Sequence, residues 1–215
     1  MRYVILLLLC WVLPVHALTD AGMLHRALPY LPTLKAEIAR AWPQHPAPAT
    51  AAAQVEQESL WNPNAHLHTA REEGYGLAQF TVTPRFNAIN ETKALDPSLR
   101  GWVNPYDVPM QLRALVAKDL QCYRLAPPSR TPQDHLAFTY AAYNGGNGGV
   151  MSDRRVCLAT KGCDPRAWTG NVELTSLKAK TAVSGYGQSF FQINRAYVRN
   201  ILVVRPVKYA SFFKD

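Results

Sequence analysis

The chain has 215 residues, 48% of them hydrophobic, and it carries a formal net charge of +8 at pH 7. This length and apolar content suffice for one well-buried domain and leave no need for a second. The positive charge favours acidic partners, but the basic residues are scattered along the chain. Because the sequence has neither a basic stripe nor a recognisable nucleic-acid-binding module, we expect no nucleic-acid partner.

The N-terminal segment has the pattern of a secretory signal. A lone Arg2 precedes an apolar run over residues 3–13, and Val15-His16-Ala17 supplies the small residues that a signal peptidase reads. The run is shorter than the roughly 20 residues that a membrane-spanning helix needs. We therefore predict a signal peptide over residues 1–17 and an exported mature chain over residues 18–215. This chain is expected in the periplasm or outside the cell, as a monomer without a stable membrane anchor.

The cysteines fit an exported protein. Cys10 lies within the predicted signal, and the leucine before it disfavours lipid attachment, which requires a small residue there. Cys157 and Cys163 are spaced to close a small loop, so we expect a disulfide in an oxidising compartment. Cys122 is then a buried free thiol, unless it pairs with one of the other two. The cysteines lack the close paired spacing of metal ligands, so no metal site is predicted.

Helical periodicity dominates the N-terminal half. Apolar residues at helical intervals over residues 24–42 predict a first helix, which the prolines of residues 43–48 interrupt. A second helix begins near Thr50 and ends before Asn62-Pro63. Glu58 is therefore predicted to lie in the last turn of a helix. The polar residues that follow, up to Tyr75, predict a loop that leads into a short element.

The second half continues in the same way. Helices are predicted over residues 106–125, over residues 132–143 and over residues 190–204, although Ile201 to Val204 also have strand propensity. The glycine-rich run over residues 144–149 stops the second of these helices. The sequence has no internal repeat or appended module. We therefore predict an all-α, or at least α-rich, single domain.

Four short motifs follow one another along the chain: ESLWNPNA at 58–65, GLAQ at 76–79, AAYNGG at 141–146 and NRAYVRNIL at 194–202. The chain thereby resembles the soluble lytic transglycosylases, in which a helix ends in Glu-Ser before Asn-Pro. Gly-Leu-Met-Gln, Ala-Tyr-Asn-x-Gly and Thr-Arg-x-Tyr-Val motifs follow in that family. The resemblance covers residues 50–202. It implies a lysozyme-like fold and cleavage of peptidoglycan glycan strands, at the β-1,4 bond between N-acetylmuramic acid and N-acetylglucosamine.

The resemblance also implies roles for individual residues. Glu58 would be the one catalytic acid, which protonates the glycosidic oxygen and then, as a carboxylate, accepts the proton of the C6 hydroxyl. The product is a 1,6-anhydromuramoyl end, so the enzyme would be a lyase that consumes no water and needs no cofactor. Gln79 and Ser59 would bind the substrate. Tyr143 would reach the catalytic acid through its hydroxyl, and Asn144 would support the helix end or bind substrate.

Proton donation to an alkoxide leaving group places its own requirement on Glu58. A carboxylic acid can do this at neutral pH only if its surroundings raise its pKa above about 4.3, so Glu58 must be partly desolvated. Most glycosidases also use a second carboxylate. Glu73 is the better candidate of the neighbouring pair Glu72 and Glu73, and it would make the chain a hydrolytic goose-type lysozyme. Glu56 is expected to point away from Glu58, as a solvated charge.

Several positions depart from the family pattern. Ala78 replaces the usual methionine and widens the cleft wall, residues 66–73 replace a Gly-Ala-rich loop, and Asn194 replaces a threonine. Three tryptophans are expected in the core rather than stacked on sugars: Trp61, Trp102 and Trp168. A different class of function, a non-catalytic peptidoglycan-binding protein, would keep the cleft without turnover. The small size of the chain favours a phage lysis enzyme over a cell-wall remodelling or wall-penetrating one.

Overall fold

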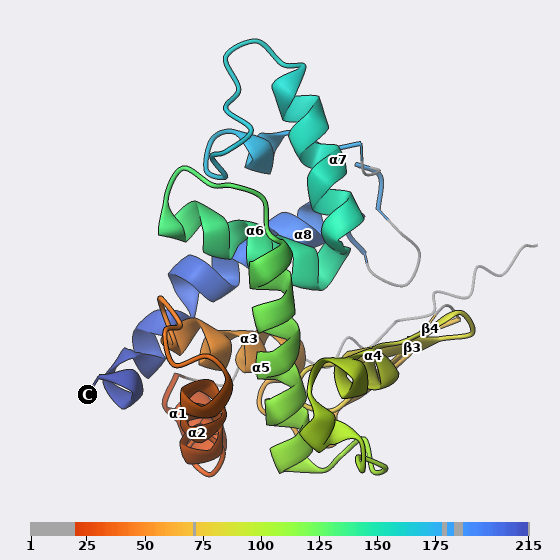
Figure 1. Cartoon of the computed structure of the whole chain (residues 1–215), viewed down its shortest axis with the longest axis vertical. Helices are drawn as coiled ribbons and strands as arrows, with labels where there is room; N and C mark the ends of the chain where they lie inside the picture. The colour runs from red at the N-terminus through yellow and green to blue at the C-terminus, as the bar shows by residue number, and fades with distance from the viewer. Residues whose placement is uncertain (1–19, 71, 178–179, 183–186, 215) are drawn as a thin grey trace, which may run out of the picture.

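The computed structural model describes residues 20–70, 72–177, 180–182 and 187–214 (Figure 1). The predicted signal peptide and its cleavage site lie outside these residues. The helices are α1 (Asp20–Ala27), α2 (Leu31–Ala41), α3 (Ala49–Ser59), α4 (Ala88–Leu95), α5 (Val108–Leu125), α6 (Pro132–Gly145), α7 (Asn147–Leu158) and α8 (Phe190–Arg199). Shorter helical turns are η1 (Pro97–Leu99), η2 (Val172–Leu174), η3 (Asn200–Val204) and η4 (Pro206–Phe213). Among the described helices, none is both long and apolar enough to cross a membrane.

Helix α5 runs along the middle of the domain (Figure 1). Asp107 caps its first turn by accepting a hydrogen bond from the backbone of Met110, and Pro109 suits that turn because its missing N–H is not needed there. Leu112 and Leu115 are fully buried, and each such burial stabilises the fold by about 2 kcal/mol. Helices α2, α4 and α6 pack against α5. The helix therefore connects the N-terminal half of the domain to the C-terminal half.

A small antiparallel sheet stands beside these helices, where the sequence predicted only a loop and a short element. Its strands are β1 (His66–His68), β2 (Glu73–Tyr75), β3 (Phe80–Thr83) and β4 (Phe86–Asn87), in the order β1-β2-β3-β4. Figure 1 shows the β3–β4 hairpin projecting away from α5. The strands have two to four residues each, and all of β1 is exposed. Such short strands leave no readable alternation, so the sequence does not predict the sheet. The mostly helical domain is confirmed.

Two predicted helix boundaries also need correction. The first predicted helix is two helices, because the chain leaves α1 at Ala27 and α2 begins only after Pro29. The glycine-rich run ends α6 as expected, but α7 begins at once, with Gly146 at a φ of 75° between the two helices. A positive φ is readily available to glycine, so the run is a corner between helices. The helix predicted over residues 190–204 is confirmed, as α8 followed by the π-helical turn η3, and Ile201 to Val204 do not form a strand.

The disulfide and the buried tryptophans agree with the sequence. Cys157 is bonded to Cys163 across the end of α7, and Cys122 is a buried free thiol. All three tryptophans are at most 4% exposed: Trp61, Trp102 and Trp168. They belong to the core, as predicted. Within the described residues, no group of three or more histidine, cysteine or acidic side chains is arranged to hold a metal ion.

Candidate active site

Helix α3 ends directly after Glu58 and Ser59. The next two residues, Leu60 and Trp61, adopt the left-handed backbone conformation, with φ of 52° and 59°. This conformation costs roughly 1 kcal/mol for a residue with a side chain. Trp61 is nevertheless held there because its ring is buried and its indole N–H donates to the Tyr209 hydroxyl at 2.8 Å. The turn stops the helix and fixes the position of Glu58 in its last turn.

The Glu58 side chain is half-buried and bound to Tyr197 of α8. The Tyr197 hydroxyl donates to Oε1 of Glu58 at 2.5 Å, and Tyr197 is itself only 4% exposed. Burial disfavours the charged carboxylate and raises the pKa of Glu58 to about 8, although the hydrogen bond from Tyr197 acts in the opposite direction. At neutral pH the folded protein therefore holds Glu58 mainly as the protonated acid, the state that a proton donor requires.

Tyr143, in the last turn of α6, lies next to this pair. Its ring stacks on that of Tyr197, with centroids 6.4 Å apart and planes inclined by 9°. Its hydroxyl donates to the carbonyl oxygen of Ala78 at 3.0 Å. Burial raises the pKa of the Tyr143 phenol well above its usual value, and a charge on Glu58 raises it further. Tyr143 thus links α6 to Tyr197, the partner of Glu58, and to the segment before β3.

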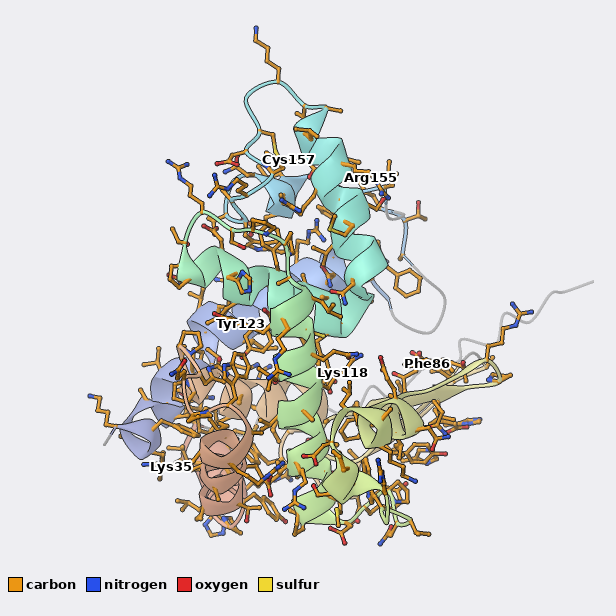
Figure 2. All side chains as sticks on the ribbon, viewed as in Figure 1. Lys35, Phe86, Lys118, Tyr123, Arg155 and Cys157 are labelled. Atoms are coloured by element: carbon orange, nitrogen blue, oxygen red, sulfur yellow. A yellow bond between two sulfur atoms is a disulfide. The ribbon has the colours of Figure 1, made fainter. Side chains whose placement is uncertain are left out.

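A pocket of about 420 Å³ opens on the other side of Tyr143. The sheet and α4 form one wall, and α5 with the α6–α7 corner forms the other. Figure 2 shows Lys118 pointing from α5 towards the side of the sheet, where Phe86 lies on the β3–β4 hairpin. Three predicted substrate-binding residues line the pocket: Gln79, Tyr143 and Asn144. Glu58 is not part of this lining, and the stacked tyrosines connect it to the pocket.

The segment that carries Gln79 is held by Gln111 of α5. The Gln111 side chain accepts a hydrogen bond from the backbone of Leu77 and donates to the carbonyl oxygen of Pro63 at 3.1 Å. Gly76 has a φ of +70°, and a Cβ on it would collide with the Gln111 side chain. Gln79 has a φ of 46° and donates through Nε2 to the carbonyl oxygen of Gly76 at 2.9 Å. The GLAQ motif is therefore a tight turn that presents Gln79 to the pocket.

Asn144 is exposed at the pocket wall and tied to α8. Its Oδ1 accepts a hydrogen bond from Nδ2 of Asn194 at 3.0 Å, and the same nitrogen donates to the carbonyl oxygen of Ala141 at 3.0 Å. Arg195 donates to Oδ1 of Asn194 at 2.9 Å and pairs with Asp153 at 2.8 Å. The asparagine that replaces the family threonine thus secures the end of α6.

The chain is similar in sequence to lytic transglycosylases of Vibrio species. No protein-family model matches the chain. The chain is 34% identical over 155 residues to a membrane-bound lytic murein transglycosylase F of Vibrio campbellii, and 31% identical over 155 residues to one of Vibrio cholerae. For one of Vibrio vulnificus the identity is 33% over 156 residues. Each alignment covers 70% of this chain but 26% of the relative, so the chain spans about a quarter of their length. The similarity supports a lytic transglycosylase family.

Two predicted site residues make contacts other than those expected from that family. The hydroxyl that reaches Glu58 belongs to Tyr197, whereas the hydroxyl of Tyr143 binds the carbonyl oxygen of Ala78. Tyr197 lies in the fourth motif, and its fixed place after the arginine was the signal that could have identified it. Ser59 is 9% exposed, and its hydroxyl donates to the carbonyl oxygen of Val55 at 3.1 Å, within its own helix. Ser59 does not belong to the pocket lining.

Glu56 is not the solvated charge that the sequence suggested. It is 2% exposed and binds the C-terminal turn η4 and the residue before it. The Tyr209 hydroxyl donates to Oε2 at 2.6 Å, Lys208 donates to Oε1 at 3.1 Å, and Arg205 pairs with the same oxygen. The direction away from Glu58 follows from the helical spacing, but the partners come from a segment that sequence spacing cannot place. Glu56 is thus committed to holding the C-terminal turn.

The two candidates for a second carboxylate differ in their surroundings. Glu73 accepts hydrogen bonds from His66 and His68, at 2.5 Å each, on the outer part of the sheet. These contacts, the one from His68 above all, lower the pKa of Glu73. Glu73 is not part of the pocket lining, whereas Glu72 is. The structure therefore brings the less favoured of the two candidates to the pocket.

Proposed function

We propose that this chain is a peptidoglycan lytic transglycosylase that cleaves the β-1,4 bond between N-acetylmuramic acid and N-acetylglucosamine, with Glu58 as its acid and then its base. The observation that carries the proposal is the environment of Glu58. Burial raises its pKa to about 8, so the acid is protonated at the pH where it must donate. The similarity to enzymes named lytic murein transglycosylases supports the same reaction.

In the proposed reaction Glu58 transfers its proton to the glycosidic oxygen as the bond from that oxygen to C1 breaks. The resulting carboxylate is stabilised by the hydrogen bond from Tyr197. Glu58 then takes the proton of the C6 hydroxyl while that oxygen forms a new bond to C1 of the same sugar. The acid is restored, no water is consumed and the product is a 1,6-anhydromuramoyl end. A second catalytic carboxylate is not needed on this route.

We assign substrate binding to the pocket beside Tyr143. Gln79 and Asn144 line it and carry amide groups suited to the N-acetyl and hydroxyl groups of the glycan. Tyr143 forms the wall between these amides and Glu58. For Ser59 the proposal requires its hydroxyl to exchange the bond to Val55 for one to the substrate. Pocket-lining amides of this kind orient a sugar chain, while the buried acid performs the proton transfers.

Digestion of purified peptidoglycan tests the proposal. Protein starting at Leu18, its Glu58→Gln variant and, as a matched control, its Glu72→Gln variant are incubated with the substrate, and the released muropeptides are analysed by mass spectrometry. We expect anhydro ends from the first and third proteins and none from Glu58→Gln. Reducing ends that depend on Glu72 would identify a hydrolytic lysozyme. Binding without products from any protein would identify a non-catalytic peptidoglycan-binding protein.

Export is the second part of the proposal, since the substrate lies outside the cytoplasm. Residues 1–17 have the composition of a signal peptide, and the disulfide between Cys157 and Cys163 suits an oxidising compartment. N-terminal sequencing of protein recovered from an expressing cell is expected to begin at Leu18. A mature protein that begins at Met1 would contradict cleavage.

A further inference from the structure

A buried polar pair lies beneath the candidate active site. Gln54 of α3 is fully buried and Asp119 of α5 is 1% exposed. Nε2 of Gln54 donates to Oδ1 of Asp119 at 3.1 Å. Gln54 precedes Glu58 by one helical turn, so the two side chains lie on the same side of α3. The pair therefore joins α3 to α5 directly behind the acid.

The second oxygen of each partner is left without a donor. Oε1 of Gln54 and Oδ2 of Asp119 are buried, and neither has a hydrogen-bond partner among the described residues. The neighbouring cation does not serve them, because Nζ of Lys118 is bound to Glu91 at 2.8 Å and to Gln121 at 2.9 Å. If Asp119 were ionised, the interior would hold a charged oxygen and an amide oxygen that are both unpaired, which is strongly unfavourable. One proton would satisfy both oxygens.

We propose that Asp119 is a neutral carboxylic acid in the folded protein, and that its proton lies between Oδ2 of Asp119 and Oε1 of Gln54. The two side chains then form a closed ring of two hydrogen bonds, one in each direction. In this arrangement Asp119 is a positioning residue, which holds α3 against α5 without placing a second negative charge behind Glu58.

The surroundings of Asp119 favour this state. The titratable groups that face it are Glu58 from α3, Lys118 and Cys122 from α5, Tyr140 and Tyr143 from α6, and Tyr197 from α8. Burial raises the pKa of Asp119 well above its usual value, the bond from Gln54 opposes this, and a charge on Glu58 raises it further. Two acids that interact in this way titrate as a coupled pair, in which ionisation of one disfavours ionisation of the other. The neutral Asp119 therefore leaves the proton affinity of Glu58 to be set by its own burial.

Infrared spectroscopy of the whole chain tests the protonation state without any assay of activity. Burial raises the pKa of both Glu58 and Asp119, so the Glu58→Gln variant removes the other carboxyl group that we expect to be protonated at neutral pH. We expect this variant to show the carbonyl stretch of a protonated carboxylic acid at neutral pH, and a Glu58→Gln, Asp119→Asn double variant to lack it. Absence of the band from Glu58→Gln protein would overturn the proposal.

The pH dependence of unfolding gives a second test. Asparagine at 119 offers an N–H to Oε1 of Gln54 and an oxygen to Nε2, so Asp119→Asn reproduces the neutral pair but cannot ionise. The folded pKa of Asp119 lies above its unfolded value near 3.8, so its contribution is complete below that pH and is lost as the pH rises. We therefore expect denaturant midpoints of wild type to fall relative to those of Asp119→Asn as the pH rises above 4. If the two midpoints change in parallel, or if the midpoint of Asp119→Asn falls relative to that of wild type as the pH rises, Asp119 is an anion in the folded protein.

If Asp119→Asn fails to fold, the double variant Gln54→Glu, Asp119→Asn takes its place, because it again places one acid opposite one amide.

A last measurement rests on the proposed function. The alkaline limb of the pH profile of peptidoglycan cleavage is expected to stay in place in Asp119→Asn, since a neutral acid is replaced by a neutral amide. A limb displaced to lower pH would mean that a charge had been removed from beside Glu58. If wild type has no activity, the proposed function fails while both earlier tests still decide the state of Asp119.

Discussion

Tyr197 and Glu58 are 139 positions apart in the sequence, yet their side chains share a hydrogen bond of 2.5 Å. The hydroxyl stabilises the carboxylate and so limits how far burial raises the pKa of Glu58. Sequence spacing placed Glu58 in the last turn of a helix because that is a local property of residues 50–63. Sequence spacing does not predict the partner of Glu58, because that partner depends on how α8 packs against α3, and the family resemblance points to Tyr143 instead.

The Tyr197→Phe variant tests this contact. It keeps the buried ring but removes the bond that favours the carboxylate, so the pKa of Glu58 is expected to rise above about 8. The alkaline limb of the pH profile of peptidoglycan cleavage should move to higher pH. The maximal rate should fall roughly 10- to 100-fold, because the carboxylate formed on proton transfer loses a charge-assisted hydrogen bond.

The Tyr143→Phe variant is the matched control, because its lost hydroxyl binds the carbonyl oxygen of Ala78 rather than Glu58. It should leave the alkaline limb where it is in wild type. If the two variants shifted the limb equally, the hydrogen bond from Tyr197 would not be the interaction that lowers the pKa of Glu58 against the effect of burial.

At the level of elements, the tight turn at 76–79 depends on one glycine. Gly76 combines a φ of +70° with a backbone position that the Gln111 side chain covers. Gly76→Ala should destabilise the protein by about 2 kcal/mol in chemical denaturation, from backbone strain and from the displaced Gln111. It should also reduce cleavage, because the turn presents Gln79. Gly101→Ala is the control: a Cβ at 101 meets nothing within 4 Å, and little change is expected. Equal losses in both variants would contradict the special role of Gly76.

The sequence predicts best the elements whose ends carry local signals, such as capping residues and prolines. The start of α5 is marked by Asp107 and Pro109, and its core face by leucines at helical spacing, so the helix was recognisable. The sequence does not predict the sheet, because β1 is exposed on every residue and therefore has no apolar alternation to mark its pairing with Glu73 to Tyr75. Gly148 belongs to the run that is predicted to stop a helix, but it lies in the first turn of α7, and the break between the two helices is at Gly146.

At the level of the whole molecule, the disulfide and the candidate active site lie in different regions. Cys157 is at the far end of α7, away from the sheet and from α3 (Figure 2). Replacing Cys157 and Cys163 together by serine should lower the free energy of unfolding by about 2 kcal/mol, as expected for a short closed loop. Cleavage by the folded variant should match wild type. Thermal unfolding and muropeptide release check the two halves of this prediction, and a folded but inactive variant would show that the loop acts on the site.

The surroundings of Glu58 come from stretches that are distant along the chain, since α3, α6 and α8 meet only in the completed fold. In an extended chain the same glutamate is hydrated, has an ordinary pKa near 4.5 and is ionised at neutral pH. It then has no proton to give. The proposed enzyme would therefore be inactive as an unfolded polypeptide, during synthesis and during export. Glu58 becomes a proton donor only when the tertiary structure forms.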